Sequence, residues 1–208
     1  MERYIYDNYL KILEEEVVIA QGCTEPIAGA LTGAIAKKHL GDDIIKEIKI
    51  IASQNIVKNA RGVIIPNTDD LMGVEPSVVL GAFFGDPNKN MEVLCNVIPE
   101  DVTFAKKFLA NGKISLEISD SPAKLFLSVE LIGENGNQSK AEIVHLHTNV
   151  VYIEENHKKI TSVDYDPNNF NSFDSDRTIM TIDSVYDFVR EVEINDLDLI
   201  KQQIYIKN

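Results

Sequence analysis

Residues 25–38 restrict the fold of this chain more than any other segment. They contain Gly29, Gly33 and four alanines, and their larger apolar side chains recur at helical spacing. A helix with so few bulky side chains lets another stretch of backbone come close to it. We therefore expect a buried helix over residues 25–38 that ends at Gly41.

The rest of the chain predicts helices near both ends and strands in the middle. Apolar residues at helical spacing favour a helix near 3–20. Prolines, acidic residues and a cap at their starts favour helices over 76–84, 99–112 and 183–191, and a last helix is expected near 195–206. Alternating apolar residues favour strands over 44–52, 114–118, 125–131, 139–147 and 149–155. This order predicts an α+β fold with N-terminal helices, a mixed or antiparallel sheet (a β meander) and C-terminal helices.

Charge and composition exclude several kinds of partner. The net charge is −13, so the chain lacks the surplus of Lys and Arg that binding to nucleic acid or to an anionic membrane requires. No apolar run approaches the roughly 20 residues of a membrane span. The first residues also lack the basic and apolar regions of a signal peptide. We expect a cytoplasmic protein with no nucleic-acid partner and no membrane partner.

The cysteine content limits metal chemistry. Cys23 and Cys95 are the two cysteines of the chain, and Cys95 is expected in the core because it follows Val93 and Leu94. Two thiols cannot supply the four thiolates of a zinc or iron–sulfur site. We therefore expect no metal and no cofactor to be held by this chain alone.

The pentapeptide 22–26, Gly-Cys-Thr-Glu-Pro, carries the strongest chemical signal. Thr24 suits a helix N-cap and Pro26 suits the first helical turn, so Cys23 would lie at the positive end of the buried helix. That position favours a thiolate and predicts a lowered pKa for Cys23. Glu25 is a candidate proton acceptor or donor, although a nearby carboxylate opposes a thiolate. The alternative is a small buried cysteine beside an ordinary helix start.

A second polar group follows the strand expected over 44–52. Residues 53–62 are polar and predict an irregular loop, which contains Ser53, Asn55, Lys58 and Asn59. Lys58 offers a positive charge for a carboxylate, and the other three offer hydrogen bonds. The alternative is a solvated loop whose asparagines form turns.

The segment 145–149 contains two histidines at alternate positions. In a strand, His145 and His147 would point to the same face, about 7 Å apart. Two histidines can share a metal, but no third ligand is evident in the sequence. His147, followed by Thr148 and Asn149, is therefore a candidate for ligand contact or proton transfer. Paired core or surface histidines are the alternative.

Several of these segments resemble the L-cysteine desulfidase family, whose members are similar to the serine dehydratase alpha subunit. The first resembling block is residues 22–28. The blocks that follow in the family's order are Ser53-x-Asn55-Ile56-x-Lys58-Asn59-x-x-Gly62, Leu80-Gly81-Ala82 and His147-Thr148-Asn149-Val150. The resemblance implies an amino-acid lyase that converts L-cysteine to hydrogen sulfide, pyruvate and ammonia, or a serine dehydratase-like lyase.

The resemblance also implies roles for particular residues. In the complete family enzyme a [4Fe–4S] cluster would bind the leaving group, and Cys23 would act as a catalytic acid–base residue together with Glu25. The residues expected to bind a small amino-acid substrate are Thr24, Ser53, Asn55, Lys58, Asn59, His147, Thr148 and Asn149. No metal-ligating residue is assigned in this chain.

Family members are much longer, and their cluster cysteines lie in the second half. Residues 1–208 would then be the single N-terminal domain of a two-part enzyme, with lobes 1–112 and 113–208. The chain would be truncated, or it would be one subunit that a partner with the missing C-terminal half completes. Alone it would be inactive. Two alternatives to the lyase are a non-catalytic module that binds a small amino acid and an inert relic. A homo-oligomer is a further possible state of the chain.

Overall fold

The computed structural model describes residues 1–169 and 173–206, which divide into two compact units. Unit 1 contains residues 1–19 and the described residues after 172, and unit 2 contains residues 20–169. The boundary expected near residue 112 lies inside unit 2, between α5 (Pro99–Asn111) and β2 (Lys113–Ile118).

Unit 2 contains a six-stranded sheet with the strand order β2-β1-β3-β4-β5-β6. β1 (Ile45–Ala52) is parallel to β2 and antiparallel to β3. The antiparallel meander continues through four strands, which are β3 (Phe126–Gly133), β4 (Gln138–Val144), β5 (Val150–Glu155) and β6 (Lys158–Ser162). The predicted α+β class with a mixed sheet is confirmed.

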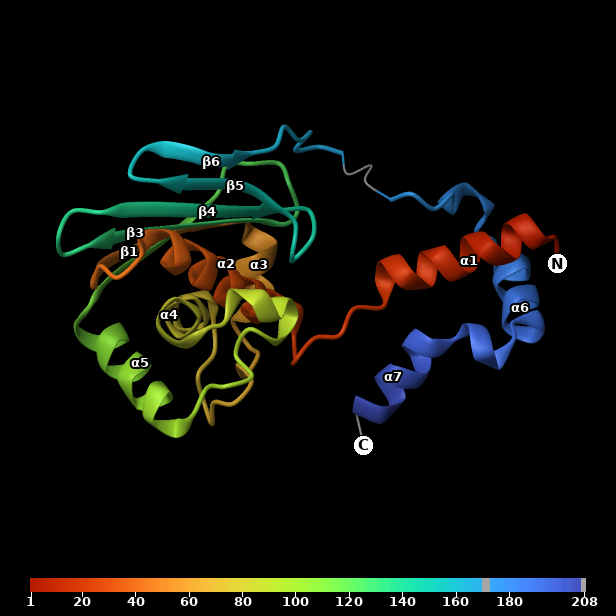
Figure 1. Ribbon diagram of the computed structural model, residues 1–208, viewed down its shortest axis with the longest axis horizontal. Helices are drawn as coiled ribbons and strands as arrows, with labels where there is room; N and C mark the ends of the chain where they lie inside the picture. The colour runs from red at the N-terminus through yellow and green to blue at the C-terminus, as the bar shows by residue number, and fades with distance from the viewer. Residues whose placement is uncertain (170–172, 207–208) are drawn as a thin grey trace. The chain divides into compact units, whose positions relative to one another are not determined.

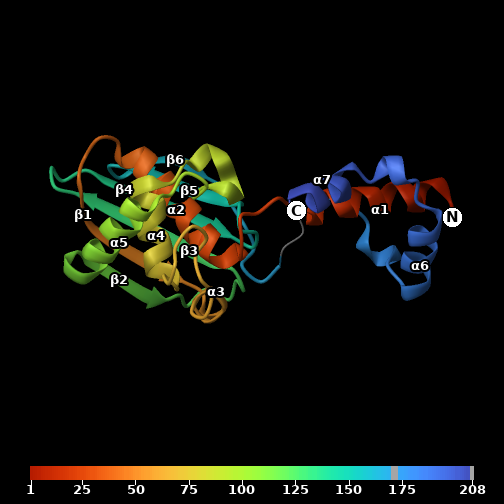
Figure 2. The same ribbon diagram turned by 90° about the horizontal axis from the view of Figure 1, so that it is seen from below.

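The glycine-rich helix is the centre of the core, as its composition predicts. α2 (Thr24–Leu40) packs against α4 (Val74–Phe84), and both lie with α5 on one side of the sheet (Figure 1, Figure 2). A Cβ added at Gly81 would lie 1.9 Å from the carbonyl oxygen of Ala30. A Cβ at Gly33 would lie 2.6 Å from the carbonyl oxygen of Val78. The two helix backbones therefore touch where glycine is the residue that fits.

The loop predicted over residues 53–62 is wrong. Residues Gln54–Ala60 form the helix α3, with Ser53 at its N-cap in an extended conformation. The apolar signal is weak because Ile56 and Ala60, one turn apart, are the buried positions of this helix. The expected burial of Cys95 is also wrong. Residues 93–96 form a turn after the 3-10 helix η1 (Pro87–Glu92), and this turn buries Val93 and Leu94 but exposes Cys95.

The strand predicted over residues 139–147 is too long. β4 ends at Val144, and His145 has a φ of +68°, which turns the chain away from the strand direction. The amide of Val144 donates to the carbonyl of Asn149 at 3.1 Å and closes the turn into β5. His145 and His147 therefore do not share one face of a strand.

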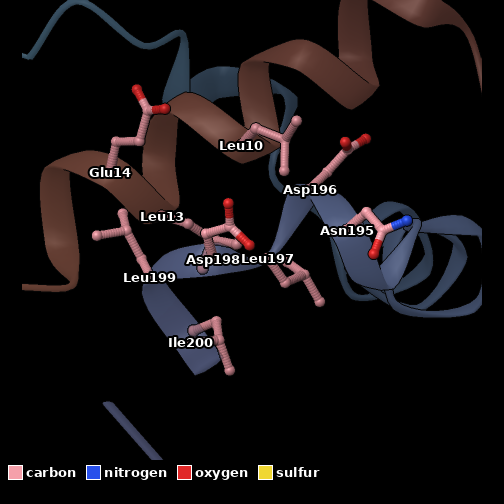
Figure 3. A pocket seen from close by; sticks show the side chains of 9 residues that line it. All are labelled: Leu10, Leu13, Glu14, Asn195, Asp196, Leu197, Asp198, Leu199 and Ile200. Atoms are coloured by element: carbon pink, nitrogen blue, oxygen red, sulfur yellow. The ribbon is translucent and has the colours of Figure 1, made fainter. Parts of the chain in front are cut away.

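Unit 1 is a small helical unit. Its elements are α1 (Arg3–Glu16), η2 (Arg177–Ile179), α6 (Ile182–Glu191), η3 (Ile194–Asp196) and α7 (Asp198–Ile206). Phe188 of α6 stacks on Tyr9 of α1, with ring centroids 4.9 Å apart. The guanidinium of Arg177 forms ion pairs with Glu15 at 3.0 Å and with Glu16 at 2.5 Å. A pocket of about 220 Å³ lies between Leu10 and Leu13 of α1 and residues 195–200 (Figure 3).

Within residues 1–169 and 173–206, no helix combines the length and the apolar character that crossing a membrane requires.

Candidate functional site

Glu25, in the first turn of α2, accepts hydrogen bonds from three side chains. The thiol of Cys23 and the hydroxyl of Thr24 both donate to its Oε2, each at 3.2 Å. The Nδ2 of Asn59 donates to its Oε1 at 2.9 Å, from the last turn of α3. The carboxylate therefore connects the start of α2 to the end of α3.

The start of α2 differs in detail from the sequence prediction. The helix begins at Thr24, and Cys23 rather than Thr24 occupies the N-cap position, with an extended backbone. Within the described residues, the Cys23 side chain makes no capping hydrogen bond. Thr24 is thus already helical, and its hydroxyl donates to Glu25 instead of accepting a hydrogen bond from a backbone amide.

His147 belongs to the same site. It lies in the turn between β4 and β5, and its Nε2 is buried with no hydrogen-bond partner among the described residues. Burial lowers the pKa of His147, and the negative charge of Glu25 opposes that effect without cancelling it. The imidazole is therefore neutral near pH 7.

Glu25 is ionised in this environment. Burial raises the pKa of Glu25, but the hydrogen bonds from Asn59 and Cys23 and from its own backbone amide lower it by more. The net pKa of the carboxyl is below its ordinary value. The site thus combines a carboxylate with a neutral imidazole.

The pKa of Cys23 moves in the direction opposite to the sequence prediction. Burial raises the pKa of the thiol, and the hydrogen bond to Glu25 raises it further. The backbone amides of Glu25 and Thr24 lower the pKa but do not overcome these two effects. The expected thiolate is therefore wrong, because the thiol donates to a carboxylate instead of facing the helix amides alone.

This result predicts the alkylation behaviour of Cys23. In a Cys95→Ala background, the rate of iodoacetamide alkylation should rise with a pH midpoint above that of free cysteine, because the thiolate is the nucleophile. Adding Glu25→Gln should lower the midpoint, since the neutral amide no longer opposes the thiolate, while burial still acts. Thiol titration by mass spectrometry measures both midpoints. A wild-type midpoint below that of free cysteine would contradict the structure.

Two of the remaining residues singled out from the sequence bind backbone groups. The hydroxyl of Ser53 donates to the carbonyl of Lys124 at 2.9 Å and accepts from the amide of Phe126 at 3.3 Å. These bonds attach the start of α3 to the start of β3. The Nδ2 of Asn149 donates to the carbonyl of Val144 at 2.9 Å and supports the turn that carries His147.

Three further residues from the sequence prediction are exposed. Asn55 lies one helical turn before Asn59 on α3, so both point to the same side of that helix. Lys58 is the exposed residue directly before Asn59, and Thr148 is the exposed residue directly after His147.

Gln21 was not identified from the sequence. The side-chain Oε1 of Gln21 is buried and has no hydrogen-bond partner among the described residues. Its backbone amide donates to the backbone carbonyl of Met91 at 3.1 Å. No periodic or motif signal distinguishes it. Its position directly before Gly22-Cys23 is the one available indication.

The described residues do not assemble a metal site. His145 and His147 have different surroundings, because the Nε2 of His145 lies 2.8 Å from the carbonyl oxygen of Asp166. Across residues 1–169 and 173–206, no group of three or more His, Cys, Asp or Glu side chains could hold a metal ion. The pocket of Figure 3 contains none of the residues of the Glu25 site.

Comparison with known proteins shows similarity to proteins that carry the name UPF0597. The chain is 36% identical to a UPF0597 protein of Treponema denticola over 98% of its length, which is 47% of that relative. It is 35% identical to one of Fusobacterium nucleatum over 94% of the chain and 44% of the relative. One of Finegoldia magna is 32% identical over 97% of the chain and 48% of the relative. The chain spans about half the length of the curated relatives it matches. No family model matches the chain.

These findings overturn the family assignment made from sequence blocks. The relatives that match nearly the whole chain are named UPF0597 proteins, and these names indicate neither an L-cysteine desulfidase nor a serine dehydratase. The lyase function and the idea of a truncated iron–sulfur enzyme are therefore wrong as stated. Short blocks that follow one order were too little evidence to assign an activity.

Proposed function

We propose that the Glu25 site binds a small amino acid and exchanges a proton with it. The observation that supports this proposal is the group formed by Cys23, Glu25, Asn59 and His147, which come from three separate segments. The buried Nε2 of His147 has no partner among the described residues, so a polar ligand atom would satisfy it.

Each group has a distinct part in the proposed proton exchange. Glu25 is the base, because its lowered pKa keeps it ionised at neutral pH. Cys23 is the acid, because its raised pKa keeps the thiol protonated. Asn59 is a positioning residue, whose hydrogen bond holds Oε1 of Glu25. The Cα–H bond of the ligand would break and its proton would move to Glu25, while the electron pair would stay on the carbon until the Cys23 thiol returned a proton. The proton held by Glu25 would then pass to the Cys23 thiolate, which restores the carboxylate and the thiol.

The charges around the site favour an amino acid as the ligand. The carboxylate of Glu25 suits an ammonium group, and the exposed Lys58 at the end of α3 suits a carboxylate. An amino acid carries both groups on one carbon. The neutral imidazole of His147 would supply a hydrogen bond to either group.

The test measures binding and exchange in the full chain. Isotope-labelled protein is titrated with a panel of amino acids, and chemical shifts are followed at Cys23, Glu25, Asn59 and His147. The same amino acids are incubated in D₂O, and deuterium at Cα is measured by mass spectrometry. We expect shifts confined to these residues and deuterium incorporation for the amino acid that binds. A panel that produces neither result would refute the proposal.

A second candidate is a module that binds an amino acid without chemistry. The pKa of Cys23 is raised and the pKa of Glu25 is lowered, so the thiol does not readily give its proton to the carboxylate. A fixed donor and a fixed acceptor are what a binding site needs. Chemical-shift changes at the site with no deuterium at Cα would support this candidate over proton exchange.

A further inference from the structure

An apolar stripe runs along the exposed side of α6 in unit 1. Ile182 is 90% exposed, Tyr186 is 61% exposed and Val189 is 66% exposed, while Val185 is 38% exposed. These positions follow the spacing i, i+3, i+4 and i+7, which places them on one face of a helix. Four adjacent apolar side chains on one exposed face are typical of an interaction surface.

The stripe is separate from the side of α6 that holds the helix in its unit. Phe188 is the buried residue of α6, and it packs on the rings of Tyr6 and Tyr9. At about 100° of rotation per residue, Phe188 points roughly a third of a turn away from the centre of the stripe. α6 can therefore keep its contact with α1 while a partner covers the stripe.

The charged residues beside the stripe indicate which kind of partner would fit it. Asp183 and Arg190 are seven residues apart, so both lie on the same edge of the stripe, opposite to the Phe188 side. Within the described chain neither side chain forms an ion pair, and the Arg190 guanidinium lies 5.6 Å from the ring centroid of Tyr186. In an antiparallel helix pair, residues on the same edge face each other across the interface. An antiparallel α6 from a second copy would thus place Asp183 of each copy beside Arg190 of the other, which makes two equivalent ion pairs.

We propose that α6 is the contact through which two copies of this chain associate, antiparallel and related by a two-fold axis. The apolar stripe is self-complementary, since residues 182 and 189 exchange places about a centre between residues 185 and 186. A helix of ten residues spans about 15 Å, so the contact is small and the association is expected to be weak.

The test uses charge reversal on the full chain. Asp183→Arg puts two positive residues on the edge of each helix, and Arg190→Asp puts two negative residues there. Each variant alone should dissociate roughly tenfold more readily than the wild type, because two attractive pairs become two repulsive pairs. An equimolar mixture of the two variants should associate at least as well as the wild type, since each edge then meets its opposite charge. Sedimentation equilibrium measures the four dissociation constants, those of the wild type, the two variants and the mixture.

Two controls complete the design. Asp183 is in the first turn of α6 and Arg190 is in the last turn, so both reversals oppose the helix dipole. Circular dichroism must therefore show that both variants are as helical as the wild type before their dissociation constants are compared. Val189→Lys, at a 66% exposed position, should also weaken association because it places a charge in the stripe. A wild-type chain that stays monomeric up to about 1 mM would overturn the proposal. The proposal would also be overturned if the two variants and their mixture all had the dissociation constant of the wild type, since the contact would then lie elsewhere.

Discussion

Replacing Gly81 by alanine is expected to destabilise unit 2 by about 3 kcal/mol or more. The added Cβ would lie 1.9 Å from the carbonyl oxygen of Ala30, 2.4 Å from its carbonyl carbon and 2.5 Å from its Cα. All three are backbone atoms of α2, so no side-chain rotation relieves the overlap. α2 and α4 would have to separate, and the layer between α2 and the sheet would lose its close packing. Urea denaturation followed by circular dichroism measures the loss in the free energy of unfolding.

Gly62→Ala is the matched control for this effect. Gly62 is exposed, follows α3, and has nothing within 4 Å of an added Cβ. The same chemical change there should alter stability by about 1 kcal/mol or less, and a small gain is allowed because alanine restricts the unfolded chain. Equal denaturation midpoints for Gly81→Ala and Gly62→Ala would contradict the close approach of α2 and α4.

Glu25→Gln is expected to reduce deuterium exchange at Cα of the bound amino acid by about 100-fold or more, because a positioned general base contributes at least that factor. The amide has nearly the shape of the carboxylate, and its oxygen can still accept from Asn59. The fold should therefore remain, while the proton acceptor and the charge that suits the ammonium group are both lost. Exchange rates at saturating amino acid, measured by mass spectrometry, separate this effect from weaker binding.

Glu75→Gln provides the control. Glu75 lies in the first turn of α4, just as Glu25 lies in the first turn of α2, and both are partly exposed. The substitution removes the same charge from the same helical position, and Glu75 takes no part in the hydrogen bonds that Glu25 accepts from Cys23, Thr24 and Asn59. Exchange that falls equally in both variants would show that the loss comes from a general change in helix electrostatics.

Much of the fold follows from the sequence, where side-chain size and period are decisive. The glycines and alanines of residues 25–38 predict a buried helix, and the structure buries residues 26–34 of α2 without interruption. Alternation along 44–52 and along 125–131 predicts strands, and β1 and β3 form there because one face of the sheet is covered by helices. In these segments local pattern and tertiary packing agree.

The errors arise where one residue decides the outcome. α3 has too few apolar positions to show a helical period, because Ile56 and Ala60 are its buried residues and most of its other residues are polar. The end of β4 depends on the left-handed backbone of His145, which few residues other than glycine adopt and no pattern indicates. The direction of the Cys23 pKa depends on whether Glu25 turns toward the thiol, and that is a property of side-chain conformation.

The site was partly accessible from the sequence. The pentapeptide 22–26 identified Cys23 and Glu25 as neighbours, and the polar segments identified Asn59 and His147 separately. Sequence separation hid the fact that Glu25 connects them, since Asn59 is 34 residues away and His147 lies in a turn of the sheet. The packing of α3 and of the β4–β5 turn brings Asn59 and His147 to Glu25, and the sequence does not show that packing.

The titration of His147 tests the central claim, that one site unites α2, α3 and the β4–β5 turn around Glu25. Nuclear magnetic resonance of the imidazole ring follows the pKa of His147 in the wild type, in Glu25→Gln and in Glu75→Gln. In the wild type the pKa should lie below the ordinary histidine value, since burial lowers it. Glu25→Gln should lower it further, because the negative charge that favours the imidazolium is removed, whereas Glu75→Gln should leave it where it was. A His147 pKa that does not respond to Glu25→Gln would contradict a shared site.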